Sequence, residues 1–583
     1  MVRGKVLDTD VLVVGNGGAG ARAAIEVARN GLRVIMSAKG MFTRCGATVT
    51  ADMDIDLPSR DAKEVFGFDG DISDTAENFA QEIFDYGQYM NNEDVVLAHC
   101  RNAAKYIKEL VDCGMVVKGF WQGPNHLIPR GILSTGRSMM ATLKKMASQC
   151  KINIADHTMI TNLLTSSGRV VGAVGIDIRT GDFLVIKAKA VILATGGAQR
   201  IYRINTAPEE LTGEGLNMAF QVGAELVDME FPKFNRSCAY WPESMQGMIY
   251  PSIATLIGGW WLNRFGERFM TKYDPIKAEK GLVDYKACTA QGLEIVEGRG
   301  GPHGGIFISF KHMPNEVMEY AMQKFPWWRN FTYGNFNLLE FDMDPRKVVY
   351  EGGPTCHYFC GGIKVNGNGE TGVAGLYAAG EVQGGTMGSG RLIGNAITEC
   401  LVFGALAGGA AANYAKNIHF AEIDKTQVDL YYERIHAPLT RKAGSDVFES
   451  RRIIQDLAFK SLGPVRDEST LTTCLEETEK MKKDVFPNLA TKAKGKVYNQ
   501  EWIAALENEA LLKVLEIMTR ASLLRKESRG SMYRRDYPET DNKDWLKNII
   551  VKNKDGKVSL ESRPVTTTII NLPKREKISY FPK

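Results

Sequence analysis

The hydrophobic pattern at the start of the chain predicts a strand, a tight turn and a helix in succession. Residues 11–14 are all valine or leucine, residues 15–20 are rich in glycine, and residues 21–30 have apolar positions at helical spacing. A second short apolar run follows at residues 32–37. The pattern therefore indicates the opening β-α-β unit of a parallel sheet and an α/β fold class.

The rest of the chain divides by pattern into several regions. Helical periodicity dominates residues 74–150, and strand-like runs occupy residues 170–176, 190–194 and 375–381. Residues 231–352 are rich in tryptophan, glycine and proline and lack a β-α-β rhythm, so we interpret them as an insertion. We expect a discontinuous Rossmann-like domain at 1–232 and 352–420, an inserted α+β capping domain at 233–351, a helical domain at 421–545, and a C-terminal hairpin and tail at 546–583.

Composition narrows the class of protein. Of 583 residues, 44% are hydrophobic and 24% are charged, which is typical of a globular protein with a large core. The net charge of +4 is too small to indicate nucleic acid as a partner. No apolar run reaches the roughly 18–20 residues of a membrane span, and the first ten residues do not resemble a secretory signal. We therefore expect a cytoplasmic protein with no direct membrane span, and leave open a peripheral position at the inner face of the membrane through partner subunits.

The ten cysteines are scattered and contain no Cys-x-x-Cys pair. This spacing argues against an iron–sulfur cluster or another metal site held by this chain. Cys356 and Cys360 stand four residues apart, and the sequence leaves open whether they form a redox pair or are simply buried thiols.

The glycine-rich turn is the strongest chemical signal in the sequence. Gly15 permits the tight turn, Gly17 lets the backbone approach a pyrophosphate, and Gly20 lets helix and strand pack closely. The helix that follows presents free N–H groups to the phosphate charge. Ser37 ends the second strand where many nicotinamide-binding folds have an acidic residue, so a flavin is favoured.

Three separated segments then agree with one known family. Residues 15–20, 194–197 and 378–381 together resemble the flavoprotein subunits of fumarate reductase and succinate dehydrogenase, whose relatives include L-aspartate oxidase and the adenylylsulfate reductase α subunit. Further segments match in order along nearly the whole chain: residues 212–215, 228–231, 266–270, 297–300, 353–363, 390–395, 525–530 and 534–538.

The resemblance implies a bound FAD and a set of residues around it. Glu381 is expected to accept hydrogen bonds from the ribityl hydroxyls, and residues 388–395 are expected to direct backbone amides at flavin N1 and O2. The full set implied for FAD is Gly15, Gly17, Gly18, Ala19, Gly20, Ser37, Ala38, Lys39, Thr43, Arg44, Cys45, Gly46, Ala47, Ala194, Thr195, Gly196, Gly197, Glu214, Glu381, Arg391, Gly394, Asn395, Ala396 and Ile397.

One departure from the family concerns the attachment of the cofactor. Relatives with covalent FAD have a histidine in the loop after the second strand, and in this chain that position is Gly46. We therefore expect non-covalent FAD. In this family the covalent bond makes the flavin a stronger oxidant, so its absence favours reduction of an acceptor.

Further departures concern the substrate. The family's His-Pro-Thr becomes Asn235, Arg236 and Ser237. The arginine that fumarate reductases use as a proton donor is missing from residues 282–286, and the charged relay that serves it is replaced by the largely apolar residues 251–257. The inherited proton source is therefore expected to be absent.

Two substrate-binding positions of the family survive as His357 and Arg391. An arginine binds carboxylate, sulfate or phosphate in a bidentate manner, and a histidine can hold the other end of the anion. The candidate catalytic residues are His357, Arg391, Asn235, Ser237 and Lys286; other possible replacement acids are Tyr285, Arg236, Lys233 and His303. Tyr240, Trp260, Trp261, Trp327 and Trp328 either line a larger pocket or form an aromatic core.

These observations predict an FAD-dependent oxidoreductase subunit. We expect it to exchange electrons between a small anionic substrate and a separate iron–sulfur protein, through chemistry other than standard fumarate or succinate turnover. One alternative is an electron-transfer module with a retired substrate site. A second is an enzyme like adenylylsulfate reductase, and a weaker third is an oxidase of the L-aspartate type.

Overall fold

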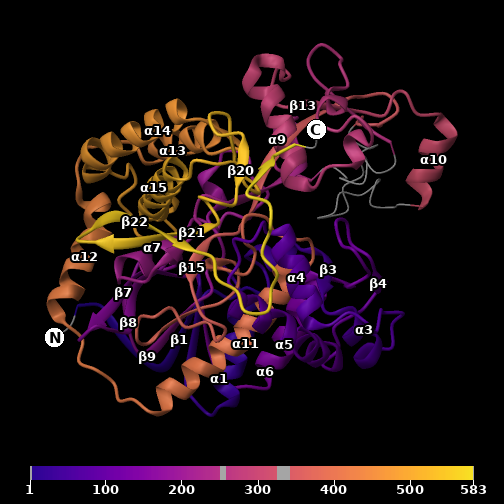
Figure 1. The fold of residues 1–583 in the computed structure, drawn as a ribbon. Coiled ribbons are helices and arrows are strands. Elements are labelled where there is room, and N and C mark those ends of the chain that lie inside the picture. Colours follow the sequence, from indigo (N-terminus) through magenta and orange to yellow (C-terminus); the bar gives the residue numbers. More distant parts are fainter. Residues whose placement is uncertain (1–2, 250–257, 325–341, 582–583) are drawn as a thin grey trace.

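A computed structural model describes residues 3–249, 258–324 and 342–581 (Figure 1). Its centre is a seven-stranded sheet in the order β6-β2-β1-β9-β8-β7, with β16 also paired to β9. The strands are β1 (Lys5–Val14), β2 (Val34–Ala38), β6 (Ile152–Asp156), β7 (Thr158–Ser166), β8 (Arg169–Asp177), β9 (Phe183–Leu193) and β16 (Leu376–Ala378). β1 pairs in parallel with both β2 and β9, as predicted for a dinucleotide-binding fold.

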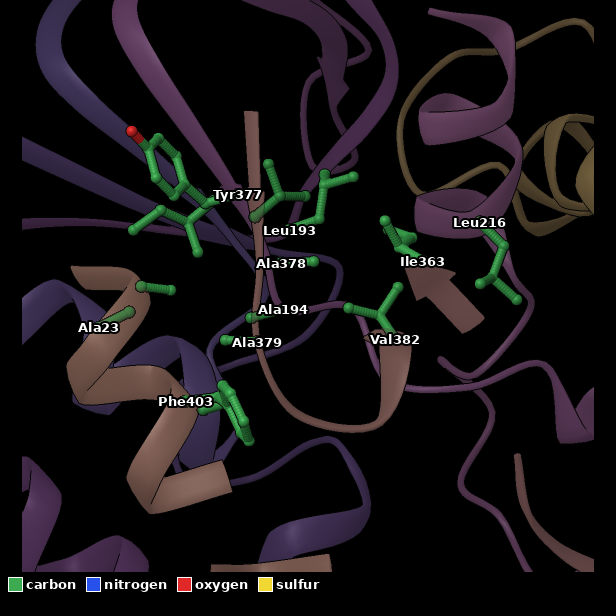
Figure 2. Close-up of a cluster of buried hydrophobic side chains, with 14 of the residues drawn as sticks. Ala23, Leu193, Ala194, Leu216, Ile363, Tyr377, Ala378, Ala379, Val382 and Phe403 are labelled. Carbon is green, nitrogen blue, oxygen red and sulfur yellow. The ribbon is translucent and has the colours of Figure 1, made fainter. Parts of the chain in front are cut away.

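Helices α1 (Gly18–Arg29) and α11 (Asn395–Lys416) pack against each other beside this sheet, and α5 (Glu93–Asp112) and α6 (Gly136–Ser148) extend the layer. Figure 2 shows Ala23 of α1 and Phe403 of α11 on one side of β16, with Leu216, Ile363 and Val382 on the other. All five side chains are buried. Small residues in α1 and α11 let the two helix backbones approach closely beneath the strand ends.

Helix α11 is the one described helix that is long and apolar enough to cross a membrane, with a mean hydropathy of 1.3. In this fold 72% of that segment is buried inside the protein. Its apolar composition is therefore accounted for by contacts with α1, α5 and β9.

The insertion forms a four-stranded antiparallel sheet in the order β11-β14-β13-β12. Its strands are β11 (Pro232–Trp241), β12 (Trp260–Leu262), β13 (Ile306–Ser309) and β14 (Tyr350–Phe359), accompanied by α9 (Asp284–Glu294) and α10 (Asn315–Lys324). A core of its own includes Trp261, Phe269 and Ile306. The long β11–β14 pair leads from this core back to the main sheet, and both strands reach the nucleotide-binding region at one end.

Four helices form the orange-to-yellow group in Figure 1: α12 (Lys425–Thr440), α13 (Val447–Ser461), α14 (Glu468–Lys480) and α15 (Gln500–Leu524). The predicted C-terminal hairpin is β21 (Lys547–Lys554) with β22 (Lys557–Pro564). It joins a five-stranded sheet with β10 (Leu226–Val227), β15 (Gly362–Lys364) and β17 (Gln383–Gly384). The hairpin is therefore tied to the nucleotide-binding region through backbone hydrogen bonds.

Residues 74–150, where helical periodicity was predicted to dominate, also contain strands. β4 (Gly119–Trp121) and β5 (Gly131–Thr135) pair with β3 (Asp52–Asp56) in a three-stranded sheet. The remaining elements are α2 (Ala47–Thr50), α3 (Ser59–Phe66), α4 (Ala76–Tyr86), α7 (Glu214–Gln221), β18 (Val465–Arg466), β19 (Tyr533–Arg534), β20 (Glu539–Asp541) and β23 (Lys577–Ser579).

Gly20 provides a test of the helix–strand contact. A Cβ at this position would lie 1.9 Å from the backbone oxygen of Gly15, whereas a Cβ at Gly17 would meet only the Thr48 hydroxyl at 3.6 Å. We expect Gly20→Ala to destabilise the protein by about 3 kcal/mol or more, because backbone must move to relieve the clash. The midpoint of thermal unfolding should fall by several degrees, and Gly17→Ala should leave it near that of the wild type. Equal midpoints for the two variants would contradict this account.

Candidate active site

A cavity of about 810 Å³ lies where the nucleotide-binding sheet meets the capping sheet. One end is formed by the carboxyl ends of β1 and β9 and the start of α1, and includes Gly15, Gly17 and Ala194. The other end is formed by β11, β14 and α9, and includes Lys233, Asp284 and His357. In open α/β sheets, ligands bind at the carboxyl ends of the strands, and this volume is within the ~300–1,000 Å³ typical of ligand pockets.

Two helix N-termini face the cavity. Gly17 is the N-cap of α1, the first turn of that helix contains no acidic residue, and Gly18 N–H donates to the Thr48 hydroxyl over 3.1 Å. Gly394, the N-cap of α11, and Ala396 also line the cavity. Helix N-termini carry partial positive charge and free N–H groups, so both suit an anionic or electron-rich ligand.

The structure brings most of the residues predicted to bind FAD to this cavity. The lining includes Gly15, Gly17, Gly18, Ala19, Ala38, Lys39, Cys45, Gly46, Ala47, Ala194, Thr195, Gly196, Glu214, Glu381, Arg391, Gly394, Ala396 and Ile397. The remaining predicted residues do not line it: Gly20, Ser37, Thr43, Arg44, Gly197 and Asn395. Gly197 makes room for the Glu381 side chain, because a Cβ there would lie 2.6 Å from the Glu381 carboxylate.

Several buried polar atoms at the cavity lack a hydrogen-bond partner within the described part of the chain. They include Thr195 Oγ1, Gln199 Oε1 and Arg391 Nε. Buried polar atoms are normally paired, so these are available to a ligand. Together with the glycine turn and the two helix N-termini, they fit the polar groups of FAD.

Glu381 lies at the centre of the cavity wall and is buried. Burial raises the pKa of its carboxyl to about 7, against the opposing hydrogen bonds from the Phe359 N–H and the Gln199 amide. The Phe359 N–H donates to Glu381 Oε1 over 2.9 Å. A carboxyl whose pKa is near neutral pH can accept or donate a hydrogen bond, which suits contact with the hydroxyls of a ribityl chain.

Lys39 lines the cavity at the end of β2 and connects three regions of the chain. Its Nζ lies 2.7 Å from Glu214 Oε1 of α7 and 2.8 Å from Glu507 Oε1 of α15. Burial lowers the pKa of Lys39, but the two carboxylates outweigh that effect and the pKa is raised. The helical region is thereby tied by charge to the wall of the cavity.

The loop in which relatives attach FAD covalently contains no histidine. Gly46 and Cys45 line the cavity, and of the histidines in the described ranges only His357, at the opposite end, does so. Burial raises the pKa of the Cys45 thiol to about 12, and that thiol donates to Asn16 Oδ1 over 3.2 Å. A protonated, hydrogen-bonded thiol is a poor nucleophile, so Cys45 is an unsuitable attachment point.

The capping end of the cavity contains a cluster of charged residues. Lys233 and Arg236 of β11 both contact Asp284, the first residue of α9, with Nζ–Oδ2 at 3.6 Å and Nε–Oδ1 at 3.2 Å. Burial raises the pKa of Asp284, but Arg236, Lys233 and Arg391 outweigh it and the pKa is lowered. Asp284 is therefore a carboxylate held between cations.

Arg391 and His357 complete this end of the cavity. The Arg391 guanidinium lies 5.0 Å from the centre of the Tyr358 ring, and Arg391 is 5% exposed. His357 Nδ1 lies 2.7 Å from the Thr206 hydroxyl. Burial, and after it the charges of Lys233 and Arg391, lower the pKa of His357 well below its ordinary value, so the ring is neutral. Asn235 lines the same wall.

The structure does not bring all the predicted catalytic residues together. Lys286 does not line the cavity, because its Nζ lies over the Tyr580 ring at 5.6 Å. Ser237 lies in β11, where the strand register is irregular, and its side chain falls outside what the structure describes. Of the other possible acids, Tyr285 packs against Tyr86, whereas Lys233 and Arg236 line the cavity.

The remaining residues of the capping region have structural roles. His303 stacks on Trp241 and lies 2.6 Å from a Glu351 oxygen. Trp261 is fully buried in the cap core, Trp260 stacks on His312, and the buried Tyr240 donates to the Pro354 carbonyl. None of these aromatic residues lines the cavity; Trp261 and Tyr240 are buried, whereas Trp260 is only partly buried. Trp327, Trp328 and residues 251–257 lie outside the described residues.

Sequence reasoning missed several cavity residues, among them Asp284, Gln199 and Asp54. Asp284 and Gln199 lie at element boundaries with no motif to mark them. Asp54 belongs to β3, where carboxylates at alternate positions 52, 54 and 56 were a usable signal. Burial and then the neighbouring Asp56 raise the pKa of Asp54 to about 7.

Comparison with known proteins agrees with this geometry. The sequence model of the family described as FAD binding domain matches residues 10–397, and that described as fumarate reductase flavoprotein C-term matches residues 451–578. The fold and site thus define an FAD-dependent oxidoreductase. The chain belongs to the fumarate reductase and succinate dehydrogenase flavoprotein family, which confirms the predicted family, fold class and cofactor.

Three relatives illustrate the likeness. The chain is 33% identical to an uncharacterized FAD-dependent oxidoreductase of Methanocaldococcus jannaschii, over 94% of this chain and 97% of that one. It is 30% identical to a fumarate reductase (CoM/CoB) component of Methanothermobacter marburgensis, over 94% and 98%. The solved structure of Mycobacterium smegmatis Sdh1 in complex with UQ1 superposes with a TM-score of 0.87 at 28% identity, covering 97% of this chain and 96% of that chain.

The contacts of Lys39 lead to a prediction about stability. Lys39→Met leaves Glu214 buried without its cation, and we expect a loss of about 3 kcal/mol. The double variant Lys39→Met/Glu214→Gln should recover part of it, because the unpaired charge is removed. Thermal unfolding measures both effects, with Lys108→Met as an exposed-lysine control that should change stability by less than about 0.5 kcal/mol. A single variant as stable as its control would show that this buried pair contributes nothing.

Proposed function

We propose that the protein exchanges electrons between a small anionic substrate and a separate iron–sulfur protein, using non-covalently bound FAD. The observation that carries the substrate class is the charge at the capping end of the cavity. Lys233, Arg236 and Arg391 are cations, and Asp284 is the one carboxylate among the described residues that contacts the first two. The three cations outnumber Asp284, and the buried carboxyls of Glu381 and Glu399 that interact with Arg391 have pKa values raised to about 7, so an anion with two negative charges suits this end.

Arg391 and His357 have different roles at the capping end of the cavity. Arg391 offers a planar guanidinium with a free Nε–H, which suits a carboxylate. The neutral His357 is held in orientation by Thr206 and can donate or accept a hydrogen bond at its other nitrogen. Bound FAD supplies hydride transfer to or from such a substrate and exchange of single electrons with a partner.

The proposal of a separate iron–sulfur partner is supported by the lack of a cluster-binding site among the described residues. None of the ten cysteines forms a disulfide, and no group of three or more potential metal ligands occurs among residues 3–249, 258–324 and 342–581. The related Methanothermobacter chain is named as one subunit of a fumarate reductase. An electron carrier in a second subunit is therefore the simplest complement.

Non-covalent FAD is tested by denaturation. We expect acid precipitation of the purified yellow protein to leave all flavin in the supernatant, because the attachment loop offers Gly46 and a protonated Cys45. Absorbance of the washed pellet after resolubilisation measures any remainder. Flavin that stays on the chain would overturn the non-covalent assignment without affecting the fold.

The anion site is tested by malonate, a dianion that cannot be reduced. Malonate should perturb the flavin spectrum of the wild type on binding, and Arg391→Met should weaken its affinity about 10–100-fold, because a hydrogen bond to a charged group contributes roughly 1.5–3 kcal/mol. The exposed Arg452→Met serves as the matched control and should bind malonate normally. Unchanged affinity in Arg391→Met would remove this residue from the anion site.

The alternative of an electron-transfer module with a retired site makes a different prediction. There, photoreduced protein would be reoxidised by no small anion, yet rapidly by an iron–sulfur protein that copurifies with it. Mixing the photoreduced protein with fumarate, larger enoates and adenylylsulfate separates these cases. Rapid reoxidation by fumarate would instead contradict our expectation of non-standard chemistry.

A further inference from the structure

We propose that Lys233 is the proton donor of the capping end, with Asp284 as the carboxylate that positions it. This inference rests on the proposed function, since it assigns a role to a residue of the same anion site. It replaces Lys286, the lysine favoured by the sequence.

Lys233 and Lys286 differ in where they lie relative to the cavity. Lys233 lines the cavity, is 5% exposed and contacts Asp284. Lys286 is also largely buried, but it lies two residues beyond Asp284 on the same helix, and its ammonium lies over the Tyr580 ring. Two residues turn a helix by about 200°, so Asp284 and Lys286 point to opposite sides of α9.

Lys233 and Arg236 both line the cavity, but they differ in how readily they release a proton. A guanidinium holds its proton far more tightly than an ammonium, and a buried lysine changes its pKa readily. Burial, and after it the charge of Arg391, lower the pKa of Lys233 from its ordinary value of 10.5. Asp284 acts in the opposite direction and keeps the ammonium form accessible.

The other titratable groups that act on Lys233 keep one charge state while it titrates: Asp284 stays a carboxylate because its pKa is lowered, Arg391 stays a guanidinium, and the rest stay neutral. Burial raises the pKa of the Cys288 thiol of α9 well above its usual value, and it raises that of Cys360, just after β14, to about 12. His357 of β14 is already neutral because its pKa is lowered. A loss of positive charge here with rising pH therefore belongs to Lys233.

The step balances for reduction of an activated carbon–carbon double bond. Reduced FAD, when bound, would supply the hydride that forms a C–H bond at one carbon as the π bond breaks. A proton from the Lys233 ammonium forms a C–H bond at the other carbon. The electron pair of the broken N–H bond stays on the nitrogen, leaving a neutral amine. The amine then takes a proton from solvent, and the Asp284 carboxylate stabilises the ammonium that forms again.

The first test measures proton uptake without turnover. Malonate binding is followed by calorimetry at pH 9 in two buffers of different ionisation enthalpy. A bound dianion raises the pKa of Lys233, so the wild type should take up a measurable fraction of a proton for each malonate bound. Lys233→Met and Lys233→Arg should take up none, and Asp284→Asn should move the uptake to lower pH, because a carboxylate that raises the pKa has been removed.

The second test follows single-turnover reoxidation of the photoreduced protein by fumarate, whatever its absolute rate. Lys233→Met should slow it by at least about 100-fold, the usual contribution of a general acid. The wild-type rate should fall as pH rises through the pKa of Lys233, and Lys233→Arg should move that fall to higher pH. Lys286→Met should behave as the wild type, which separates the two lysines.

The outcomes distinguish the two proposals. If malonate fails to bind to wild type that holds its flavin normally, the anion site and the proposed function are both overturned. If malonate binds, but Lys233→Met keeps both proton uptake and reoxidation rate, only the assignment of Lys233 is overturned. Proton uptake tests whether Lys233 titrates beside the bound anion even where fumarate is a poor acceptor, and the reoxidation rate tests whether it donates the proton.

Discussion

The arrangement of the active site depends on one carboxylate held among buried cations. Asp284 begins α9 and contacts Lys233 and Arg236 of β11, so it fixes a helix of the cap against the strand that enters the cavity. Charges of this kind are costly to bury unless each has a partner. The cations of the cluster outnumber Asp284, and the anion site that we propose rests on this excess of positive charge. The same charged side chains therefore hold the cap in place and form the proposed anion site.

Much of the nucleotide-binding half is predictable because its signals are local. The turn at Gly15 to Gly20 follows an apolar strand, and the parallel β1, β2 and β9 strands follow from their apolar runs. The strands β3 to β5 were missed because β4 and β5 are short and lie between long helices. These strands pair through tertiary contacts, which the periodicity of hydrophobic residues along the sequence does not reveal.

The capping residues were less predictable because their roles depend on rotation and register. A period of two places Lys233 and Asn235 on one face of β11, but Arg236 reaches the same cavity through the irregular register beside it. Likewise, a motif aligned along 282–286 does not show which residue of α9 turns toward the strand. Asp284 does and Lys286 does not, which is a matter of helix phase set by tertiary packing.

Helix α11 has a consequence for how the chain acquires its shape. A segment of 22 residues with this apolar composition would, before it folds, be attractive to chaperones and membrane insertion machinery. Its burial partners α1, α5 and β9 all precede it in the sequence. During synthesis these three elements leave the ribosome before α11 does. They are therefore available to cover the apolar surface of α11 as soon as it leaves the exit tunnel.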